Sequence, residues 1–446
     1  MSTVRSLRIR MGDIGVGSLF ALDDGRTYFR FDDAYAAIQA PDRPVLSQAY
    51  EASTPEATRM QLSDPMLAAN RGDGRGALPP FFENLLPEGR LRKHLVELSG
   101  LDPNDSLGLL AYCGLDLPGN IQAVAEDLST EEMGRLLGQS QDSYEQSSGQ
   151  LPTPQGESIS GVQPKVALVR DAGGRYVMRS KTRGGHFIGK LPTGDYPRLP
   201  EVEHASLRLA QAAGVTTCRH ELLPLSAIAD RLPFEMRADA DRFLLVHRYD
   251  RDADTPNGRR HAEDFAQVTS TPPEQKYSLG YAEIGAALLA RSSRPRQDVH
   301  ELVRRIVVNE LLGNPDAHLK NFGFLYDTPQ SAALSPAYDI VAYSVYMPNT
   351  GHGLALVPGE AKHRQLRPIV LRIWANLWSL PERGLQETVM QTVDAAMTQW
   401  PALLPELPLL PEHRERLWRH AQEGALGSKW HTRTRRARAR AASQSA

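Results

Sequence analysis

The chain has 446 residues, of which 41% are hydrophobic and 23% are charged, a composition typical of globular proteins. This length favours about two or three domains, and the formal net charge of −2 argues against a whole surface built to bind nucleic acid. Cys113 and Cys218 are the only cysteines, and neither lies in a pairing motif. A disulfide framework and a cysteine zinc site are therefore not predicted, which fits a reducing cytoplasm.

Neither a membrane span nor a signal peptide is expected. The N-terminal arginines are followed by Asp13, and the apolar run from Val16 to Leu22 is short and interrupted by glycine. No stretch approaches the roughly 18 uninterrupted apolar residues that a spanning helix needs. We therefore expect a cytoplasmic protein.

Residues 1–125 mix strand and helix patterns, which predicts an N-terminal α/β subdomain. Ser6 to Met11 and Tyr28 to Phe31 are the expected strands. The stretch from Pro79 to Arg90 is an apolar patch closed by a proline, which we interpret as a buried helix start, with a partner-binding surface as the alternative. Residues 126–155 are rich in Ser, Gln, Glu, Asp and Pro and predict a linker or mobile loop.

Residues 156–250 begin with a loop of small residues from Glu157 to Lys165. A hairpin is predicted next, with strands at Val166 to Val169 and Arg175 to Met178. A strand from His186 to Leu191 follows and carries Lys190.

A helix is predicted from Pro200 to Gly214, with Glu201 and Glu203 near its start. The order of loop, hairpin, lysine strand and helix with an early glutamate is that of the small lobe of a protein kinase, where the lysine holds nucleotide phosphates and the glutamate orients it. A further strand from Asp241 to Arg251 would connect the small lobe to the next one, beside an adenine.

The segment from Asn309 to Asn321 predicts an active-site loop. A helix with apolar residues at Leu302, Ile306 and Leu311 precedes it and ends before Pro315. Asp316 and Asn321 have the Asp-x-x-x-x-Asn spacing of a phosphotransferase loop. In such a loop the aspartate is the base for the acceptor hydroxyl, and the amide oxygen of the asparagine binds Mg²⁺. This spacing alone is a weak signal, and the kinase-like order of elements before it strengthens the interpretation.

Asp339 lies in an apolar stretch from Ala337 to Ala342, which we interpret as a strand. Mg²⁺ commonly takes one or two hard oxygen ligands from the protein and others from phosphates, so Asn321 and Asp339 form a sufficient set.

Residues 251–428 predict a mostly helical large lobe, with helices marked by Trp374 and Trp378 and by Val389 to Trp400. The proline-rich segment from Pro401 to Pro411 is predicted to be a loop. Residues 429–446 carry basic but no acidic side chains, which predicts a disordered tail, with weak attraction to nucleic acid as the alternative.

Together, these motifs closely resemble the HipA family of serine/threonine kinase toxins, from about residue 6 to about residue 425. The segments that carry the resemblance are Phe81 to Pro87, Ser158 to Lys165, His186 to Pro192, Arg248 to Arg251, Glu263 to Gln267, Asp316 to Asn321 and Ala337 to Ile340.

The resemblance implies an α+β, protein-kinase-like bilobal fold with a divergent Gly-rich loop, plus the N-terminal subdomain. It implies ATP and Mg²⁺ as cofactors and a cytoplasmic protein substrate, often an aminoacyl-tRNA synthetase. It also implies a bacterial toxin–antitoxin system in which a small helix-turn-helix antitoxin restrains the kinase, so that DNA is contacted only through the antitoxin.

Site residues follow from the same resemblance. Asp316 would be the catalytic base and Lys190 the phosphate-binding lysine, while Glu203 would orient Lys190, with Glu201 as the rival. Ser158 would be autophosphorylated, with Ser160 as a second or competing site. The implied ATP contacts, which include the Mg²⁺ ligands Asn321 and Asp339, are Ser160, Gly161, Val162, Gln163, Lys190, His247, Tyr249, His318, Lys320, Asn321 and Asp339.

This chain departs from the family at His247, where many relatives have glutamate, and matches it only loosely from Gly351 to Leu356. Three alternatives stay open from the residues. The same fold could serve a small-molecule or lipid kinase, or the chain could be a catalytically silent corepressor acting through a DNA-bound partner. A metallohydrolase built on Asp316 and His318 is disfavoured, because no second histidine lies at ligand spacing; we expect His318 to hold the loop by hydrogen bonding.

Overall fold

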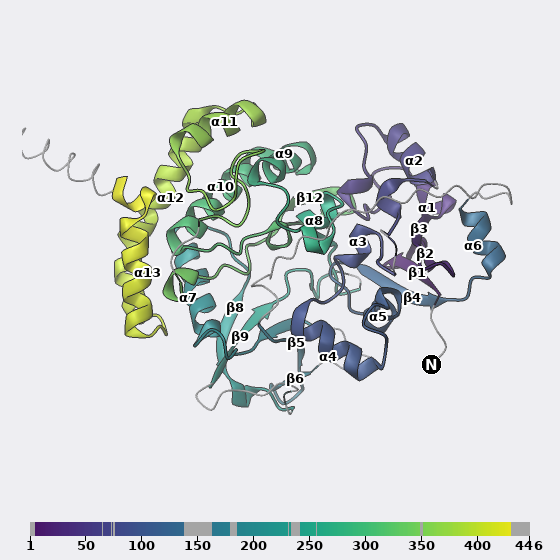
Figure 1. Cartoon of the computed structure of the whole chain (residues 1–446), viewed down its shortest axis with the longest axis horizontal. Coiled ribbons are helices and arrows are strands. Elements are labelled where there is room, and N and C mark those ends of the chain that lie inside the picture. Colours follow the sequence, from purple (N-terminus) through teal and green to yellow (C-terminus); the bar gives the residue numbers. More distant parts are fainter. Residues whose placement is uncertain are drawn as a thin grey trace, which may run out of the picture.

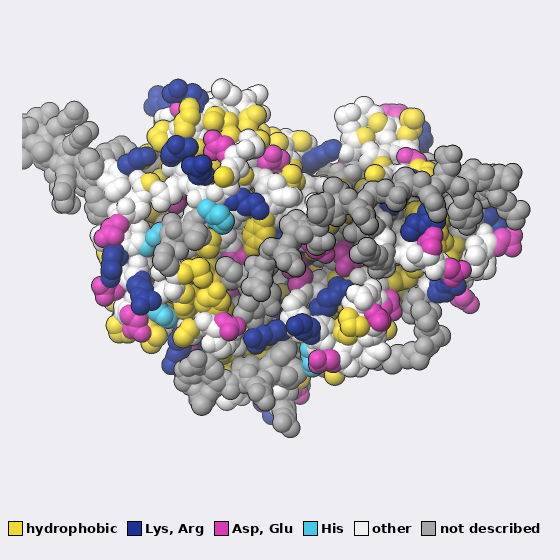
Figure 2. All heavy atoms as spheres, viewed as in Figure 1, with side chains coloured by type: hydrophobic (Ala, Val, Ile, Leu, Met, Phe, Trp, Pro, Cys, Tyr) yellow, Lys and Arg dark blue, Asp and Glu magenta, His cyan; other side chains and the backbone are white. Residues whose placement is uncertain are grey.

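The computed structural model describes residues 5–64, 66–72, 74, 76–137, 163–178, 185–230, 232, 241–255, 257–347 and 351–429. Figure 1 shows an N-terminal domain beside a body of two lobes, one built around a sheet and the other mainly of helices. In Figure 2, basic and acidic side chains are interspersed on the face in view, which fits the small net charge. Among the described residues, no helix is both long and apolar enough to cross a membrane.

The N-terminal domain is an antiparallel four-stranded sheet with the strand order β3-β2-β1-β4. Its strands are β1 (Ser6–Met11), β2 (Ile14–Ala21), β3 (Thr27–Phe31) and β4 (Ile121–Glu126), so both expected strands are confirmed. The helices of this domain are α1 (Asp33–Ala37), α2 (Pro55–Ser63), α3 (Pro80–Glu83), α4 (Gly89–Ser99), α5 (Ser106–Cys113) and α6 (Thr130–Leu136).

Two helices of this domain bear on the sequence predictions. Helix α3 begins in the apolar patch, and Phe81 and Phe82 are fully buried, which confirms the buried helix start. Helix α6 lies in the first part of the segment predicted to be a linker or mobile loop, so residues 130–136 are helical and that prediction was wrong for them, while residues 138–155 lie outside the described residues. A capping box of Ser129 and Glu132 starts it, and Met133 packs with Phe20.

The small lobe is an antiparallel five-stranded sheet with the order β6-β5-β7-β9-β8. It contains β5 (Lys165–Arg170), β6 (Tyr176–Met178), β7 (Phe187–Lys190), β8 (His220–Pro224) and β9 (Arg242–His247), with helix α7 (Leu199–Ala212) packed against β9. The predicted hairpin, lysine strand and helix are thus confirmed.

The large lobe is mainly helical. Its helices are α8 (Phe265–Val268), α9 (Tyr281–Arg291), α10 (Pro295–Leu312), α11 (Pro368–Trp378), α12 (Glu382–Leu403) and α13 (Pro411–Glu423), and a small antiparallel sheet is formed by β10 (Ala262–Asp264), β11 (Gly323–Thr328) and β12 (Ser331–Leu334). One apolar core joins this lobe to α7. Because the indole of Trp400 in α12 donates a hydrogen bond to the Leu209 carbonyl (2.9 Å), the large lobe directly supports α7.

Two local predictions were wrong. Helix α12 continues through Pro401 to Leu403, and a short 3₁₀ turn covers Leu404–Glu406, so the proline-rich segment is not entirely a loop. The stretch from Ala337 to Ala342 is not a strand, because Ala337 makes only an isolated bridge, to Thr217, and Asp339 has a left-handed φ of +52°. An apolar run indicates burial, and a buried loop satisfies that pattern as well as a strand does.

Candidate active site

Lys190 and Glu203 form a buried ion pair between β7 and α7. Only 5% of Lys190 and 1% of Glu203 is exposed. Burial disfavours the charged lysine, but the carboxylates of Asp339 and Glu203 hold the pKa of Lys190 above its ordinary value. The rival Glu201 instead pairs with Arg198 (2.9 Å), so the structure places Glu203, and not Glu201, on the lysine.

Asp339 adds a second carboxylate to Lys190, with which it also forms an ion pair. Its other carboxylate oxygen lies 3.7 Å from the ammonium of Lys165 and 3.4 Å from the amide nitrogen of Asn321. Although burial opposes ionisation, the two lysines lower the pKa of Asp339, so this carboxylate is charged.

The backbone around Asp339 is fixed on both sides. The Ala337 carbonyl accepts from the Cys218 amide (2.9 Å), and the Ala342 amide donates to the hydroxyl of Ser206 in α7 (2.9 Å). A non-glycine residue with positive φ costs of order 1 to 3 kcal/mol and persists where its surroundings determine it, often at functional sites. These two anchors provide such surroundings for Asp339.

Asn321 and Asp339 fit the requirements of Mg²⁺ as a pair of neighbouring oxygen-bearing side chains. The Asn321 amide oxygen accepts from the His318 backbone amide (2.8 Å) and keeps a second lone pair for another partner. Within the described ranges, no group of three or more His, Cys, Asp and Glu side chains could hold a metal ion. A cation at Asn321 and Asp339 would therefore need further ligands, which nucleotide phosphates can provide.

Asp316 lies in the loop that follows α10, which ends at Leu312 with Gly313 in left-handed geometry (φ +62°). The Asp316 amide donates to the side chain of Asn314 (3.1 Å), and the Tyr277 hydroxyl donates a hydrogen bond to the Asp316 carboxylate. Burial raises the pKa of Asp316 to about 6, although the bond from Tyr277 opposes this shift. A carboxyl with this pKa can act as a general base near neutral pH.

His318 holds its loop in a different way from the one expected. The backbone amide donates to Asn321, whereas neither ring nitrogen has a hydrogen-bond partner in the part of the chain that the structure describes. Burial lowers the pKa of His318 to about 3, so the ring is neutral. The expectation that the His318 side chain hydrogen-bonds is therefore wrong for the described residues.

The other sequence-predicted ATP contacts are more scattered. Gln163 donates to the Leu191 carbonyl (3.3 Å), which places it beside the end of β7. The His247 ring lies 2.9 Å from Glu221, and Tyr249 packs on Tyr338 with 5.6 Å between ring centroids. The expected ATP contacts Ser160, Gly161 and Val162 lie outside the described residues, as does the expected autophosphorylation site Ser158.

Lys320 was also expected to contact ATP. Its ammonium donates to the Asn84 carbonyl (3.0 Å) and pairs with Glu88 (2.9 Å), both of the N-terminal domain. These contacts hold Lys320, and the loop that carries it, against the N-terminal domain.

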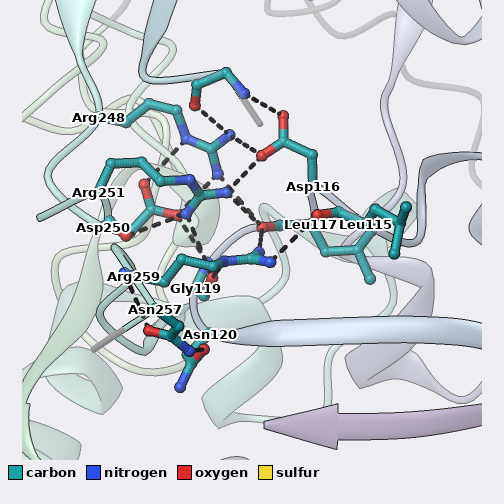
Figure 3. Close-up of polar contacts among 11 residues, drawn as sticks. Leu115, Asp116, Leu117, Gly119, Asn120, Arg248, Asp250, Arg251, Asn257 and Arg259 are labelled. Atoms are coloured by element: carbon teal, nitrogen blue, oxygen red, sulfur yellow. Dashed lines mark hydrogen bonds and ion pairs between the residues drawn. The ribbon is translucent and has the colours of Figure 1, made fainter. Parts of the chain in front are cut away.

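A buried ion cluster joins the N-terminal domain to the segment after β9 (Figure 3). Asp116 accepts from Arg248 (3.1 Å), from Arg251 (2.7 Å) and from the backbone amide of Gly185 (2.9 Å), which lies just before β7. Asp250 also pairs with both arginines (2.9 and 2.7 Å). The cluster thereby fixes the connection between the lobes and the start of the lysine strand.

Arg259 lies beside this cluster, and among the described residues it forms no ion pair with a carboxylate (Figure 3). Its guanidinium donates to the carbonyls of Leu115, Leu117 and Gly119. Burial and the neighbouring arginines lower its pKa to about 9.

The chain matches two family models, the HipA N-terminal domain over residues 7–124 and the HipA-like C-terminal domain over residues 157–400. A protein of Sinorhizobium fredii, named the putative kinase Y4dM, is 32% identical over 429 residues, which cover 94% of this chain and 97% of that protein. The chain belongs to the HipA family.

Two further comparisons extend this assignment. The serine/threonine-protein kinase toxin HipA of Shewanella oneidensis is 24% identical, over 61% of this chain and 66% of that protein. A solved structure of HipA from the same species, in complex with HipB and its operator DNA, matches with a TM-score of 0.67 and 20% identity and covers 94% of this chain and 97% of that one. The HipA-family fold of this chain is therefore α+β, bilobal and protein-kinase-like, as the sequence predicted.

Sequence reasoning missed several polar residues of this HipA-family site. Tyr277 contacts the proposed base, and Lys165 accompanies Lys190 at Asp339. Glu88 and Asp116 reach the site from the N-terminal domain. The only signal for Lys165 was its place at the end of the small-residue loop, and that for Glu88 was its place in the apolar patch from Pro79 to Arg90. Tyr277 and Asp116 lie in no pattern that marks a function.

Proposed function

We propose that the chain is an ATP-dependent serine/threonine-protein kinase that acts as the toxin of a toxin–antitoxin pair. One observation carries the kinase assignment: Lys190 pairs at once with Glu203 of α7 and with Asp339. In protein kinases, the pair between this strand lysine and the helix glutamate, together with the metal-binding aspartate, must be in place for phosphoryl transfer.

Each residue has a distinct task in this proposal. Lys190 binds nucleotide phosphates, and Glu203 fixes its orientation. Asn321 and Asp339 hold Mg²⁺, which when bound neutralises charge on the phosphates. Asp316 accepts the proton of the acceptor hydroxyl, and Tyr277 orients the Asp316 carboxylate through its hydrogen bond. The presence of this complete set favours an active enzyme over a silent corepressor.

The family suggests the acceptor and the partner. A relative named as a serine/threonine-protein kinase toxin supports a protein hydroxyl as acceptor over a small molecule or lipid. The fold likeness to a HipA solved with HipB and operator DNA supports a small helix-turn-helix antitoxin, with DNA contacted through that partner. We place the reaction in the cytoplasm, and aminoacyl-tRNA synthetases are the first acceptors to test.

The decisive experiment compares wild type with Asp316→Asn. Each is incubated with Mg²⁺ and ATP labelled on its γ-phosphate, with and without a panel of aminoacyl-tRNA synthetases, and incorporation into protein is followed. Wild type should label itself or an acceptor. Asp316→Asn should bind ATP with similar affinity, because Lys190 and the metal hold the nucleotide, but it should transfer no phosphate, because the Asp316 carboxylate accepts the proton of the acceptor hydroxyl. Absence of transfer by the wild type would reject the kinase assignment, and transfer by Asp316→Asn would reject Asp316 as the base.

A further inference from the structure

Glu88 belongs to the N-terminal domain but contacts the large lobe. It precedes α4, and although this is the position of a helix cap, its side chain makes no capping hydrogen bond. One carboxylate oxygen lies 2.8 Å from the ammonium of Lys276, and the other lies 2.9 Å from that of Lys320. Burial disfavours a charged carboxylate here, yet Lys320 and Lys276 lower the pKa of Glu88 to about 2. Glu88 is thus a charged bridge between two lysines of the other domain.

The neighbours of Glu88 reinforce this contact. The side-chain amide of Asn84 donates to the Thr271 carbonyl (2.8 Å), and the Asn84 carbonyl accepts from Lys320 (3.0 Å). The Gln267 side chain donates to the Phe81 carbonyl (3.1 Å). Figure 1 shows α3 and α8 next to each other at the centre of the molecule, in agreement with their contacts. The segment from Phe81 to Glu88 is therefore docked along its length.

Each lysine of this bridge is one residue away from the proposed chemistry. Lys320 directly precedes Asn321, and Lys276 directly precedes Tyr277, whose hydroxyl donates to Asp316. The Leu319 amide also donates to the Lys276 carbonyl (3.1 Å), which joins the two segments. A shift at Glu88 would therefore move both the base and a metal ligand, and a misplacement of about 1 Å can cost about 100-fold in rate.

We propose that Glu88 is a positioning residue for phosphoryl transfer, through which the N-terminal domain holds the Asp316 loop in its productive geometry. The inference rests on the proposed kinase function. It gives the apolar patch at Pro79 to Arg90 a role in addition to packing. The buried phenylalanines anchor the segment, and Glu88 at its end orders the active-site loop.

The test compares full-length wild type with Glu88→Gln, which keeps the size of the side chain and removes its charge. Glu97→Gln is the matched control, because Glu97 is an exposed glutamate of α4 with no ion pair among the described residues. Glu88→Gln should lower kcat for transfer from ATP by about tenfold or more. The Kd for ATP with Mg²⁺ should rise much less, because Lys190 and Asp339, which are held by other residues, still bind the nucleotide and the metal. A general loss of folding would not produce this division between kcat and Kd.

Two further measurements separate positioning from stability. Backbone amides of residues 316–322 should exchange with deuterium faster in Glu88→Gln than in Glu97→Gln, because opening of the loop becomes easier. Tyr277→Phe should lower kcat much less in the Glu88→Gln background than in wild type, because both changes act on the same carboxylate. Should Glu88→Gln not fold, the double variant Glu88→Gln/Lys276→Met is used in every assay instead, because it also removes the buried ammonium that pairs with Glu88.

The outcomes distinguish the two proposals. If wild type transfers phosphate and the Glu88 variant does so with unchanged kcat, Glu88 is not a positioning residue and the kinase assignment stands. If wild type transfers no phosphate, the kinase assignment fails. Deuterium exchange still tests whether Glu88 orders the loop, and unchanged exchange over residues 316–322 in Glu88→Gln would reject that role as well.

Discussion

Lys165 and Lys190 are direct cross-strand partners in β5 and β7, so two lysine side chains stand together on one face of the small-lobe sheet. Like charges placed opposite each other destabilise a sheet unless other groups compensate. Asp339 provides this compensation, since one of its oxygens faces each lysine. The site thus concentrates positive charge where nucleotide phosphates would bind.

Asp339→Asn tests this charge balance. Removing one member of a buried ion pair leaves its partner uncompensated, so the variant should lose about 3 kcal/mol of unfolding free energy. ATP with Mg²⁺ should raise the melting temperature of wild type but not that of Asp339→Asn, because the metal loses its carboxylate ligand. Calorimetry with and without the nucleotide measures both effects.

Asp42→Asn, at an exposed position, is the control, and its unfolding free energy should differ from that of wild type by less than about 0.5 kcal/mol. If Asp339→Asn melts at the wild-type temperature and is still stabilised by ATP with Mg²⁺, Asp339 is not the metal ligand.

The pH dependence of transfer should report Asp316. Its raised pKa of about 6 means that the carboxyl is protonated and inactive as a base below this pH, so kcat/KM should rise as the pH increases through about 6. Asp264 also has a pKa raised by burial to about 6, so the profile alone does not identify the group.

Tyr277→Phe resolves this ambiguity. The Tyr277 hydrogen bond lowers the pKa of Asp316, so its loss should move the acid limb of the profile to higher pH. Tyr28→Phe, on β3 of the N-terminal domain, should leave the limb in place. Initial rates from pH 5 to pH 8 are the measurement, and an identical limb in the Tyr277 and Tyr28 variants would show that another group titrates.

Asp116→Asn tests the cluster shown in Figure 3. The change removes a carboxylate that is 3% exposed and shared by two arginines, which should cost about 3 kcal/mol of stability. It also weakens the bond to Gly185 before β7, so the Kd for ATP should rise more than kcat falls. Asn257→Ala breaks a solvent-exposed bond to Asn120 in the same interface (2.7 Å) and is the control. Unchanged ATP affinity in the Asp116 variant would show that the cluster does not organise the lysine strand.

Autophosphorylation is predicted at Ser158, at Ser160 or at both, in the loop that lies outside the described residues. The family resemblance implies that this loop covers the ATP phosphates. A phosphate would add about −1.5 to −2 charges to the loop, so the modified enzyme should bind ATP weakly. Intact-mass and peptide mass spectrometry should find phosphate on wild type and none on Asp316→Asn. A wild-type protein that transfers phosphate to an acceptor but stays unmodified on this loop would contradict self-inactivation.

The sequence by itself determined the family and most of the helices and strands around the site. Helices α7 and α10 follow from apolar residues at helical spacing, with Gly214 and Gly313 just after their ends. The strand with Lys190 and the Asp316 to Asn321 spacing follow equally from local pattern. These features depend on residues close together in the chain, whose preferences act before any domain docks.

Only the tertiary structure decided which charged groups meet between the N-terminal domain and the lobes. Glu88 lies 188 residues before Lys276, and Asp116 lies 132 residues before Arg248. The sequence around a charged side chain does not indicate its partner, because any lysine or arginine in the chain could form the ion pair with a given carboxylate. The partner is fixed when the N-terminal domain docks on the lobes and removes water from both groups, since an unpaired charge buried there would be costly.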